Sequence, residues 1–139
     1  MTPSTPVSPL YPKAPVCLIV EDNEIDSMRL TRIIRKSKLK LRIEVASTIT
    51  RARETVAWGN IALILLDNNL PDGLGADFAI ELAQDPDTAN IPVIMVSDWP
   101  SPFMWEKAAS AGVRYVLGKT EFDTRYVHAS LQPRRTNAR

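Results

Sequence analysis

Short aliphatic runs alternate with amphipathic segments along most of the chain. The five runs lie at residues 16–20, 41–45, 61–66, 91–97 and 114–118. Three of them are apolar almost throughout, which is typical of parallel strands that are covered on both faces. The pattern therefore predicts five strands of one sheet, buried beneath helices.

Amphipathic segments follow the runs, at residues 24–37, 49–58, 76–84, 103–111 and 121–131. In the first two segments apolar residues recur at helical spacing, and we expect them to face the sheet. They are Ile25, Met28, Ile33 and Ile34 in the first segment, and Ile49, Ala52 and Val56 in the second. Five alternations of strand and helix predict an α/β fold, in which right-handed crossovers place helices on both faces of an open parallel sheet.

The length of 139 residues allows one domain with a single core, which we place at residues 15–131. A net charge of +1 does not favour binding to nucleic acid or to a membrane surface. No apolar stretch is long enough to span a bilayer, and no signal peptide is evident. The single cysteine, Cys17, lies in an apolar run, so we expect it to be packed as a small hydrophobic side chain. Together these features predict a cytoplasmic protein.

The two ends of the chain differ from the centre. Prolines at positions 3, 6, 9, 12 and 15 match the three-residue repeat of polyproline II. Residues 1–14 could bind a proline-recognising domain or form a flexible, solvated tail, and we adopt the tail. Residues 132–139 are basic and are interpreted as a second tail.

Polar residues with related chemistry stand at the ends of four predicted strands. Glu21 and Asp22 follow the first strand, Asp67 the third, Ser97 ends the fourth, and Lys119 follows the fifth. Because open α/β sheets bind ligands at the carboxyl ends of their strands, we expect these side chains to meet at one edge. Three carboxylates at one place repel each other, and a divalent cation such as Mg²⁺ relieves that repulsion.

A carboxylate held beside Mg²⁺ can attack phosphorus and form an aspartyl phosphate. Phosphoryl transfer needs mainly positioning and charge neutralisation, which the cation and Lys119 would supply. Ser97 could donate a hydrogen bond to a phosphoryl oxygen. We therefore expect Asp67 to be a phosphate acceptor.

With these residues in this order, the chain resembles the receiver domain of bacterial two-component response regulators over about residues 15–131. The matching pieces are "LIVEDN", "LLDNNLPDGLG", "VIMVS" and "AGVRYVLGK". The resemblance implies a flavodoxin-like, doubly wound sheet of five parallel strands in the order 2-1-3-4-5.

The resemblance also implies roles for the strand-end residues. Asp67 would accept a phosphoryl group from a histidine kinase or a phosphotransfer protein. Asp22, Asp67 and the backbone carbonyl of Asn69 would coordinate Mg²⁺, and Glu21 would act through water. Ser97 and Lys119 would bind the phosphoryl oxygens.

Several positions depart from the family pattern. Val116 stands where an aromatic switch residue is usual, three before the lysine, and Tyr115 would face the opposite side of the sheet. Asp98 replaces a residue that is commonly small, and its carboxylate would oppose a phosphate unless it points away or binds a cation. Thr120 replaces a proline after Lys119. Pro100 and Pro102 precede the fourth helix, and proline is tolerated in a first helical turn.

Large apolar residues gather after the fourth strand. Trp99 could exclude water from the phosphorylated site and slow hydrolysis, or it could simply be packed. Phe103, Met104 and Trp105 are consecutive, and one helix cannot bury three consecutive side chains against one core. At least one of them should be exposed on a switch or partner surface together with Trp99, Tyr115 and Val116.

The sequence thus predicts a single-domain response regulator that signals through an unknown downstream protein; a homodimer is an open alternative. It is not expected to be an enzyme beyond Mg²⁺-dependent self-phosphorylation from a donor and autodephosphorylation. One competing interpretation is a phosphate-independent receiver that binds a partner constitutively, as Asp98 and Val116 suggest. Another is an aspartate-nucleophile phosphatase, but such enzymes need a second acid where Asn69 stands.

Overall fold

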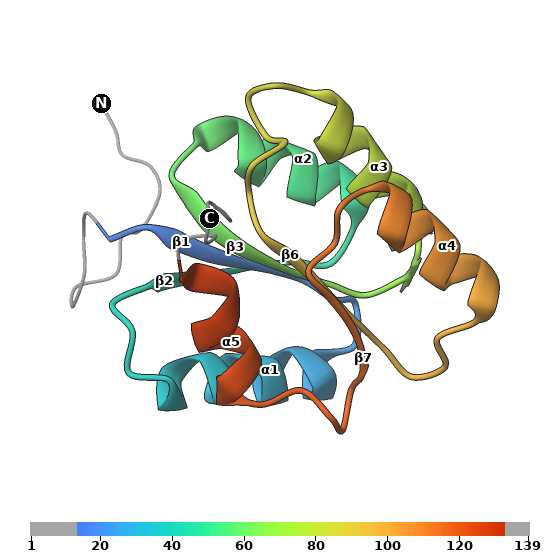
Figure 1. Cartoon of the computed structure of the whole chain (residues 1–139). Coiled ribbons are helices and arrows are strands. Elements are labelled where there is room, and N and C mark those ends of the chain that lie inside the picture. The colour runs from blue at the N-terminus through green and yellow to red at the C-terminus, as the bar shows by residue number, and fades with distance from the viewer. Residues whose placement is uncertain (1–13, 133–139) are drawn as a thin grey trace, which may run out of the picture.

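In the computed structural model, which describes residues 14–132, five parallel strands form one sheet between two layers of helices (Figure 1). The strands are β1 (Val16–Val20), β2 (Arg42–Ala46), β3 (Ile61–Leu66), β6 (Val93–Ser97) and β7 (Tyr115–Gly118). They lie in the order β2-β1-β3-β6-β7. This is the predicted order 2-1-3-4-5 when the five strands of this sheet alone are numbered along the chain. A short antiparallel hairpin of β4 (Asn69–Leu70) and β5 (Gly73–Leu74) adds a second, two-stranded sheet that the sequence did not predict.

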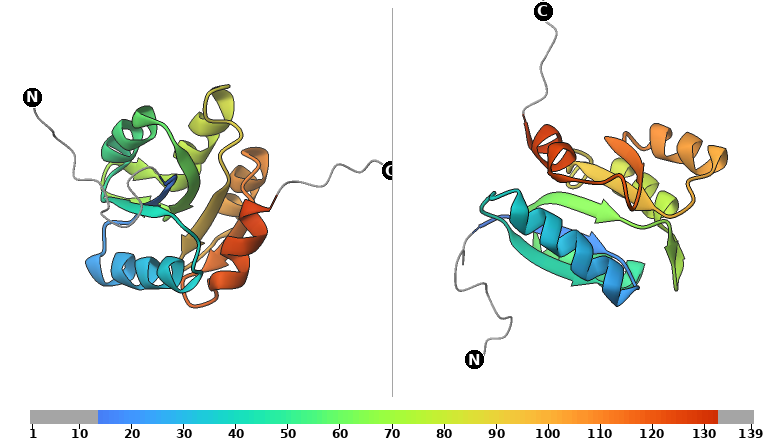
Figure 2. Two further views of the ribbon diagram at one scale, coloured as in Figure 1. Left: turned by 90° about the vertical axis from the view of Figure 1, so that its left-hand side faces the viewer. Right: turned by 90° about the horizontal axis from the view of Figure 1, so that it is seen from below.

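The helices are α1 (Glu24–Lys36), α2 (Ile49–Trp58), α3 (Gly75–Gln84), α4 (Pro102–Ser110) and α5 (Thr124–Leu131). Helices α1 and α5 cover one face of the sheet, and α2, α3 and α4 cover the other (Figures 1 and 2). The predicted proline-rich and basic tails lie almost wholly outside the described residues.

The strand residues alternate between two apolar cores because the side chains of a strand point to opposite faces in turn. In β1, Leu18 and Val20 pack toward α2 and α3, whereas Cys17 and Ile19 pack toward α1 and α5. Cys17 is fully buried, as predicted, and burial raises the pKa of its thiol far above the ordinary value. The protonated thiol thus serves as a packing group.

Helix α1 is rotated relative to the sequence prediction. Leu30 and Ile34 are buried against the sheet as helical spacing requires, but Ile25 and Met28 are 77% and 56% exposed. The buried residue between them is Ser27, whose hydroxyl donates a hydrogen bond to the Glu24 carbonyl at 3.0 Å. Since that hydroxyl has its own partner, a small polar residue can lie under the helix where a larger apolar one was expected.

Helix α4 begins at Pro102, so the prolines delay the helix without preventing it. Ser101 caps it, accepting a hydrogen bond from the Met104 amide at 3.2 Å. Pro102 occupies the first helical position, where the missing N–H costs nothing. Helix α5 begins at Thr124, three residues later than predicted, because Asp123 accepts a hydrogen bond from the Arg125 amide and caps it there.

Candidate functional site

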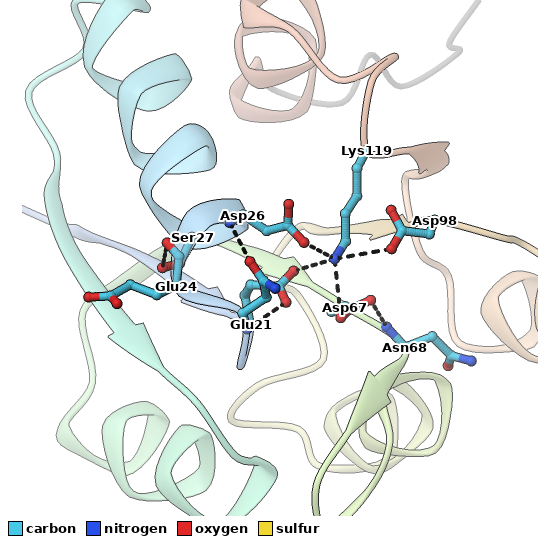
Figure 3. Close-up of polar contacts among 9 residues, drawn as sticks. Glu21, Glu24, Asp26, Ser27, Asp67, Asn68, Asp98 and Lys119 are labelled. Carbon is cyan, nitrogen blue, oxygen red and sulfur yellow. Dashed lines mark hydrogen bonds and ion pairs between the residues drawn. The ribbon is translucent and has the colours of Figure 1, made fainter.

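Three of the predicted strand-end residues, Glu21, Asp67 and Lys119, come together at the carboxyl edge of the sheet (Figure 3). Strands β1 and β3 are neighbours in register, with Val20 opposite Leu66, so the residues that follow them lie side by side. These residues are Glu21 and Asp67, and the Asp67 amide donates to the Val20 carbonyl at 3.0 Å. The sheet topology therefore holds two carboxylates together at one edge.

Three carboxylates form what we call the acidic pocket: Glu21, Asp22 and Asp67. One oxygen from each lies within 4.8 Å of the others. Glu21 and Asp67 are buried, and Asp22 is exposed at the opening. An oxygen-only ligand set with one side open to solvent suits a hard divalent cation that keeps several of its waters. The acidic pocket could therefore bind a divalent metal ion.

Burial makes the carboxyl groups of Glu21 and Asp67 hard to ionise without a bound metal ion. It raises the pKa of Glu21 to about 7, although Lys119 and the Asn23 amide act in the opposite direction. Burial also raises the pKa of Asp67, against the charge of Lys119 and a hydrogen bond from the Asn68 amide. A bound cation would favour the charged forms, so the chemistry of the ligands fits a metal site.

Lys119 lies at the centre of the site. Its ammonium nitrogen is 2.9 Å from Glu21 Oε1 and 3.6 Å from Asp67 Oδ2. Burial by itself would lower the pKa of Lys119, but the hydrogen bond to Asp26 and the pairing with Glu21 raise it above its ordinary value. The side chain therefore stays a cation beside the predicted acceptor.

Ser97 ends β6 opposite Gly118 of β7, so its hydroxyl and Lys119 come from adjacent strand ends. The Ser97 side chain is buried, and its Oγ is among the few buried polar atoms that lack a hydrogen-bond partner within residues 14–132. A buried hydroxyl without a partner is costly unless a ligand supplies one. This observation fits a group with acceptor oxygens at the site.

Close backbone packing explains why the "LLDNNLPDGLG" segment ends in a glycine, Gly75. A Cβ atom there would lie 2.0 Å from the backbone oxygen of Asp67. The Gly75 amide donates to the Asn68 carbonyl at 2.7 Å, which closes the loop after β3 against the start of α3. Only glycine allows the two backbone segments to approach so closely.

Asn69 starts β4 two residues after Asp67 and is exposed. That its backbone carbonyl is a metal ligand stays a prediction.

Two positions that depart from the expected family pattern, Val116 and Asp98, have different surroundings. Val116 packs into the core beneath α3 and α4, while Tyr115 lies on the opposite face with its ring 5.1 Å from that of Tyr126. The prediction that Tyr115 faces away from the usual switch position is therefore confirmed. Asp98 is largely exposed, and its Oδ2 lies 3.8 Å from the ammonium of Lys119, so it faces a cation.

Three side chains form what we call the aromatic surface: Trp99, Phe103 and Trp105, which are 88%, 63% and 51% exposed. The suggestion that Trp99 is simply packed is wrong. Met104, predicted as part of the same surface, is instead buried in the core, because its place on α4 turns it inward while its two neighbours turn outward. The prediction that one of the three consecutive residues must be exposed is confirmed by Phe103 and Trp105.

Sequence reasoning missed Asp26. Its Oδ2 accepts a hydrogen bond from the Lys119 ammonium at 2.7 Å, the shortest contact that Lys119 makes with a carboxylate (Figure 3). The signal available was its place in the first turn of α1, four residues after Asp22. Within residues 14–132, no helix is long and apolar enough to cross a membrane.

Comparison with known proteins identifies the family. The family model for the response regulator receiver domain matches residues 17–132. The two-component response regulator ORR3 of Oryza sativa subsp. indica is 26% identical over 106 residues, covering 76% of this chain and 79% of the rice protein.

Solved structures that share the fold include two response regulators. The Mn²⁺-bound form of response regulator Rcp1 has a TM-score of 0.71 and 22% identity, covering 84% of this chain and 89% of its own. The phosphorylated cyanobacterial phytochrome response regulator RcpA has a TM-score of 0.70 and 21% identity, covering 85% and 87%. The matched family model, which spans most of the described residues and the whole acidic pocket, shows that this chain belongs to the response regulator receiver domain family.

Proposed function

We propose that the protein is a phosphorylation-controlled signalling module that accepts a phosphoryl group on Asp67. The observation that carries this proposal is the environment of Asp67: a buried carboxylate with Lys119 at 3.6 Å, two further acids beside it, and the unpartnered Ser97 hydroxyl on a nearby strand end. A buried carboxylate that is paired only loosely with a cation keeps an oxygen available as a nucleophile. The response regulator RcpA, which shares this fold, is known in a phosphorylated form.

The natural donor in this proposal is a histidine kinase or a phosphotransfer protein, as for receivers of two-component systems. An oxygen of Asp67 forms the new bond to phosphorus while the donor's P–N bond breaks, and the nitrogen keeps the electron pair and takes up a proton. Lys119 and Ser97 would meet the phosphoryl oxygens with an ammonium and a hydroxyl. Output would pass to a downstream protein.

The metal in this proposal is Mg²⁺, which Asp22, Asp67 and the carbonyl of Asn69 would hold, with Glu21 acting through water. When bound, it would neutralise negative charge that accumulates on the phosphoryl group. The Mn²⁺-bound form of Rcp1 supports a divalent cation in a related fold. The acidic pocket alone would repel a phosphate donor, so donor binding and cation binding should be coupled.

The test is the intact mass of the protein after incubation with Mg²⁺ and phosphoramidate. We expect a single phosphoryl adduct on the parent and none on Asp67→Asn. The control is Asp87→Asn, which changes an exposed acid outside the acidic pocket and should still give the adduct. If the parent binds Mg²⁺ but forms no adduct, the protein is instead a phosphate-independent binding module, the alternative that Asp98 and Val116 suggest.

A further inference from the structure

Asp26 is the carboxylate that Lys119 binds best. The ammonium of Lys119 lies 2.7 Å from Asp26 Oδ2 with the geometry of a hydrogen bond. Glu21 Oε1 is 2.9 Å away, but this atom has no partner that meets hydrogen-bond geometry within the described residues. A charge-assisted hydrogen bond of good geometry is the stronger constraint on where an ammonium lies.

Asp26 also stands apart from the acidic pocket. Its oxygens are not among those of Glu21, Asp22 and Asp67 that gather within 4.8 Å. It belongs to the first turn of α1, where its backbone amide donates to the Asn23 side chain at 2.9 Å. A cation bound by the acidic pocket would engage Glu21 and leave Asp26 free to keep its contact with Lys119.

The position at which Asp26 holds Lys119 suits phosphoryl binding. A direct hydrogen bond between an ammonium and a carboxylate measures about 2.8 Å, whereas Lys119 lies 3.6 Å from Asp67 Oδ2. The ammonium is thus close to the acceptor without occupying its oxygen. Asp98, at 3.8 Å and largely exposed, makes only a long contact from the other side.

We propose that Asp26 is a positioning residue for phosphoryl transfer, which holds the Lys119 ammonium where an oxygen of the incoming phosphoryl group meets it. This inference rests on the proposed function of Asp67. Without Asp26, the carboxylates nearest to Lys119 are Glu21 and Asp67. The ammonium would then move toward Asp67, pair with the oxygen that must attack, and leave the place that the phosphoryl oxygen needs.

The experiment compares phosphorylation rates from phosphoramidate in the parent, Asp26→Asn and Asp26→Glu, with the Mg²⁺ dissociation constant measured on each. We expect Asp26→Asn to slow adduct formation about tenfold, because small errors in position are costly in phosphoryl transfer. Mg²⁺ affinity should change less than threefold, and Asp26→Glu should recover part of the rate. Within residues 14–132 the Asp26 carboxylate accepts a hydrogen bond from Lys119 alone and caps no helix, so Asp26→Asn should fold. If it does not, Asp26→Ser carries the same test.

The matched control is Asp77→Asn. Asp77 accepts a hydrogen bond from Lys107 at the same distance of 2.7 Å, but on the α3–α4 surface away from the site. It should leave the phosphorylation rate unchanged. An unaltered or faster rate in Asp26→Asn, or an equal loss in Asp77→Asn, would overturn the role of Asp26 while the proposed function stands. Absence of any adduct on the parent would overturn both.

Discussion

The acidic pocket and the aromatic surface differ in burial and in what holds them in place. The inner carboxylates of the acidic pocket are buried and follow strand ends that are in register. The three large side chains of the aromatic surface extend into solvent from the β6–α4 loop and from α4. We therefore expect the proposed phosphoryl chemistry and the proposed contact with a partner protein to respond to different substitutions.

Backbone packing places Asp67 in the acidic pocket, and we expect a substitution at Gly75 to disturb that packing most. Replacing Gly75 by alanine places a Cβ atom 2.0 Å from the Asp67 carbonyl oxygen, so the loop after β3 must move. We expect a loss of about 3 kcal/mol in the free energy of unfolding, together with loss of the phosphoryl adduct. Denaturant titration and intact mass would measure the two effects.

The control for that change is Gly118→Ala, next to Lys119. There a Cβ atom would meet only the Glu121 side chain, whose Oε1 would be nearest at 3.3 Å and accepts a hydrogen bond from the Gly118 amide at 2.7 Å. A side chain, and not the backbone, would have to shift. The cost should stay below about 1 kcal/mol. If both alanine variants cost the same, the close approach at Gly75 is not what holds Asp67 in place.

The acidic pocket should also bind Mg²⁺ in a pH-dependent manner. The pKa of Glu21 is raised to about 7 and that of Asp67 is raised as well, chiefly by burial. A carboxyl group whose pKa is raised by folding contributes stability that is fully present below its pKa in the unfolded chain, near 4. This contribution is lost as the pH rises through the pKa in the folded protein, which is about 7 for Glu21. The cation needs the deprotonated forms, so its affinity should increase with pH over the same range.

Calorimetric titrations with Mg²⁺ at pH 6, 7 and 8 would test this expectation. Affinity should rise by up to about tenfold per pH unit below pH 7 and level off above it. Glu21→Gln should bind more weakly and show a flatter pH dependence. The exposed α4 acid changed in Glu106→Gln serves as the control, which should follow the parent. A Mg²⁺ affinity that is constant from pH 6 to 8 would contradict the raised pKa of Glu21.

Much of this pocket was predictable from sequence because it depends on topology. The bounds of β1, β3 and α2 match the predicted ranges, and parallel strands of known order bring Glu21, Asp67 and Lys119 to one edge. No pattern predicted that Asp26 reaches Lys119, because that contact depends on the rotation of α1. The rotation was misjudged, since Ile25 and Met28 are apolar yet exposed, and the small Ser27 takes the buried position.

A third test concerns Asp72, which connects the loop after Asp67 to α2. Its carboxylate accepts hydrogen bonds from the amides of Ile49 and Thr50 at 2.8 and 2.9 Å. These bonds hold the pKa of Asp72 below its ordinary value. A lowered carboxyl pKa contributes stability that is present above about pH 4, the unfolded value, and is lost as the pH falls through the folded value.

Asp72→Ala should therefore lower the thermal unfolding midpoint at pH 7, and the difference from the parent should shrink below about pH 4. Thermal melts followed by circular dichroism from pH 3 to pH 7 would show this. Asp87→Ala offers a matched comparison, since Asp87 is also exposed and its carboxylate accepts no hydrogen bond within residues 14–132. A difference between Asp72→Ala and the parent that persists unchanged at pH 3 would rule out the charged carboxylate as its origin.

The smallest effect on the isolated protein should come from the aromatic surface. Trp99 is 88% exposed, so little of the indole is available to shield Asp67 from water. We expect Trp99→Ala to change the free energy of unfolding by less than about 0.5 kcal/mol and the hydrolysis rate of the adduct by less than twofold. An adduct that decays much faster in Trp99→Ala would revive the suggestion that the indole excludes water.

Met104 provides the internal contrast for that measurement, because it is adjacent in sequence to Phe103 and Trp105 yet buried. Met104→Ala should cost about 2–3 kcal/mol, as truncations of buried methionine do, whereas Trp105→Ala should cost a small fraction of that. Large exposed aromatic side chains that contribute so little to folding are typical of surfaces used for contact with another protein. If Trp99→Ala and Trp105→Ala proved as destabilising as Met104→Ala, these side chains would be packing residues. The aromatic surface would then not be a surface kept for contact with a partner.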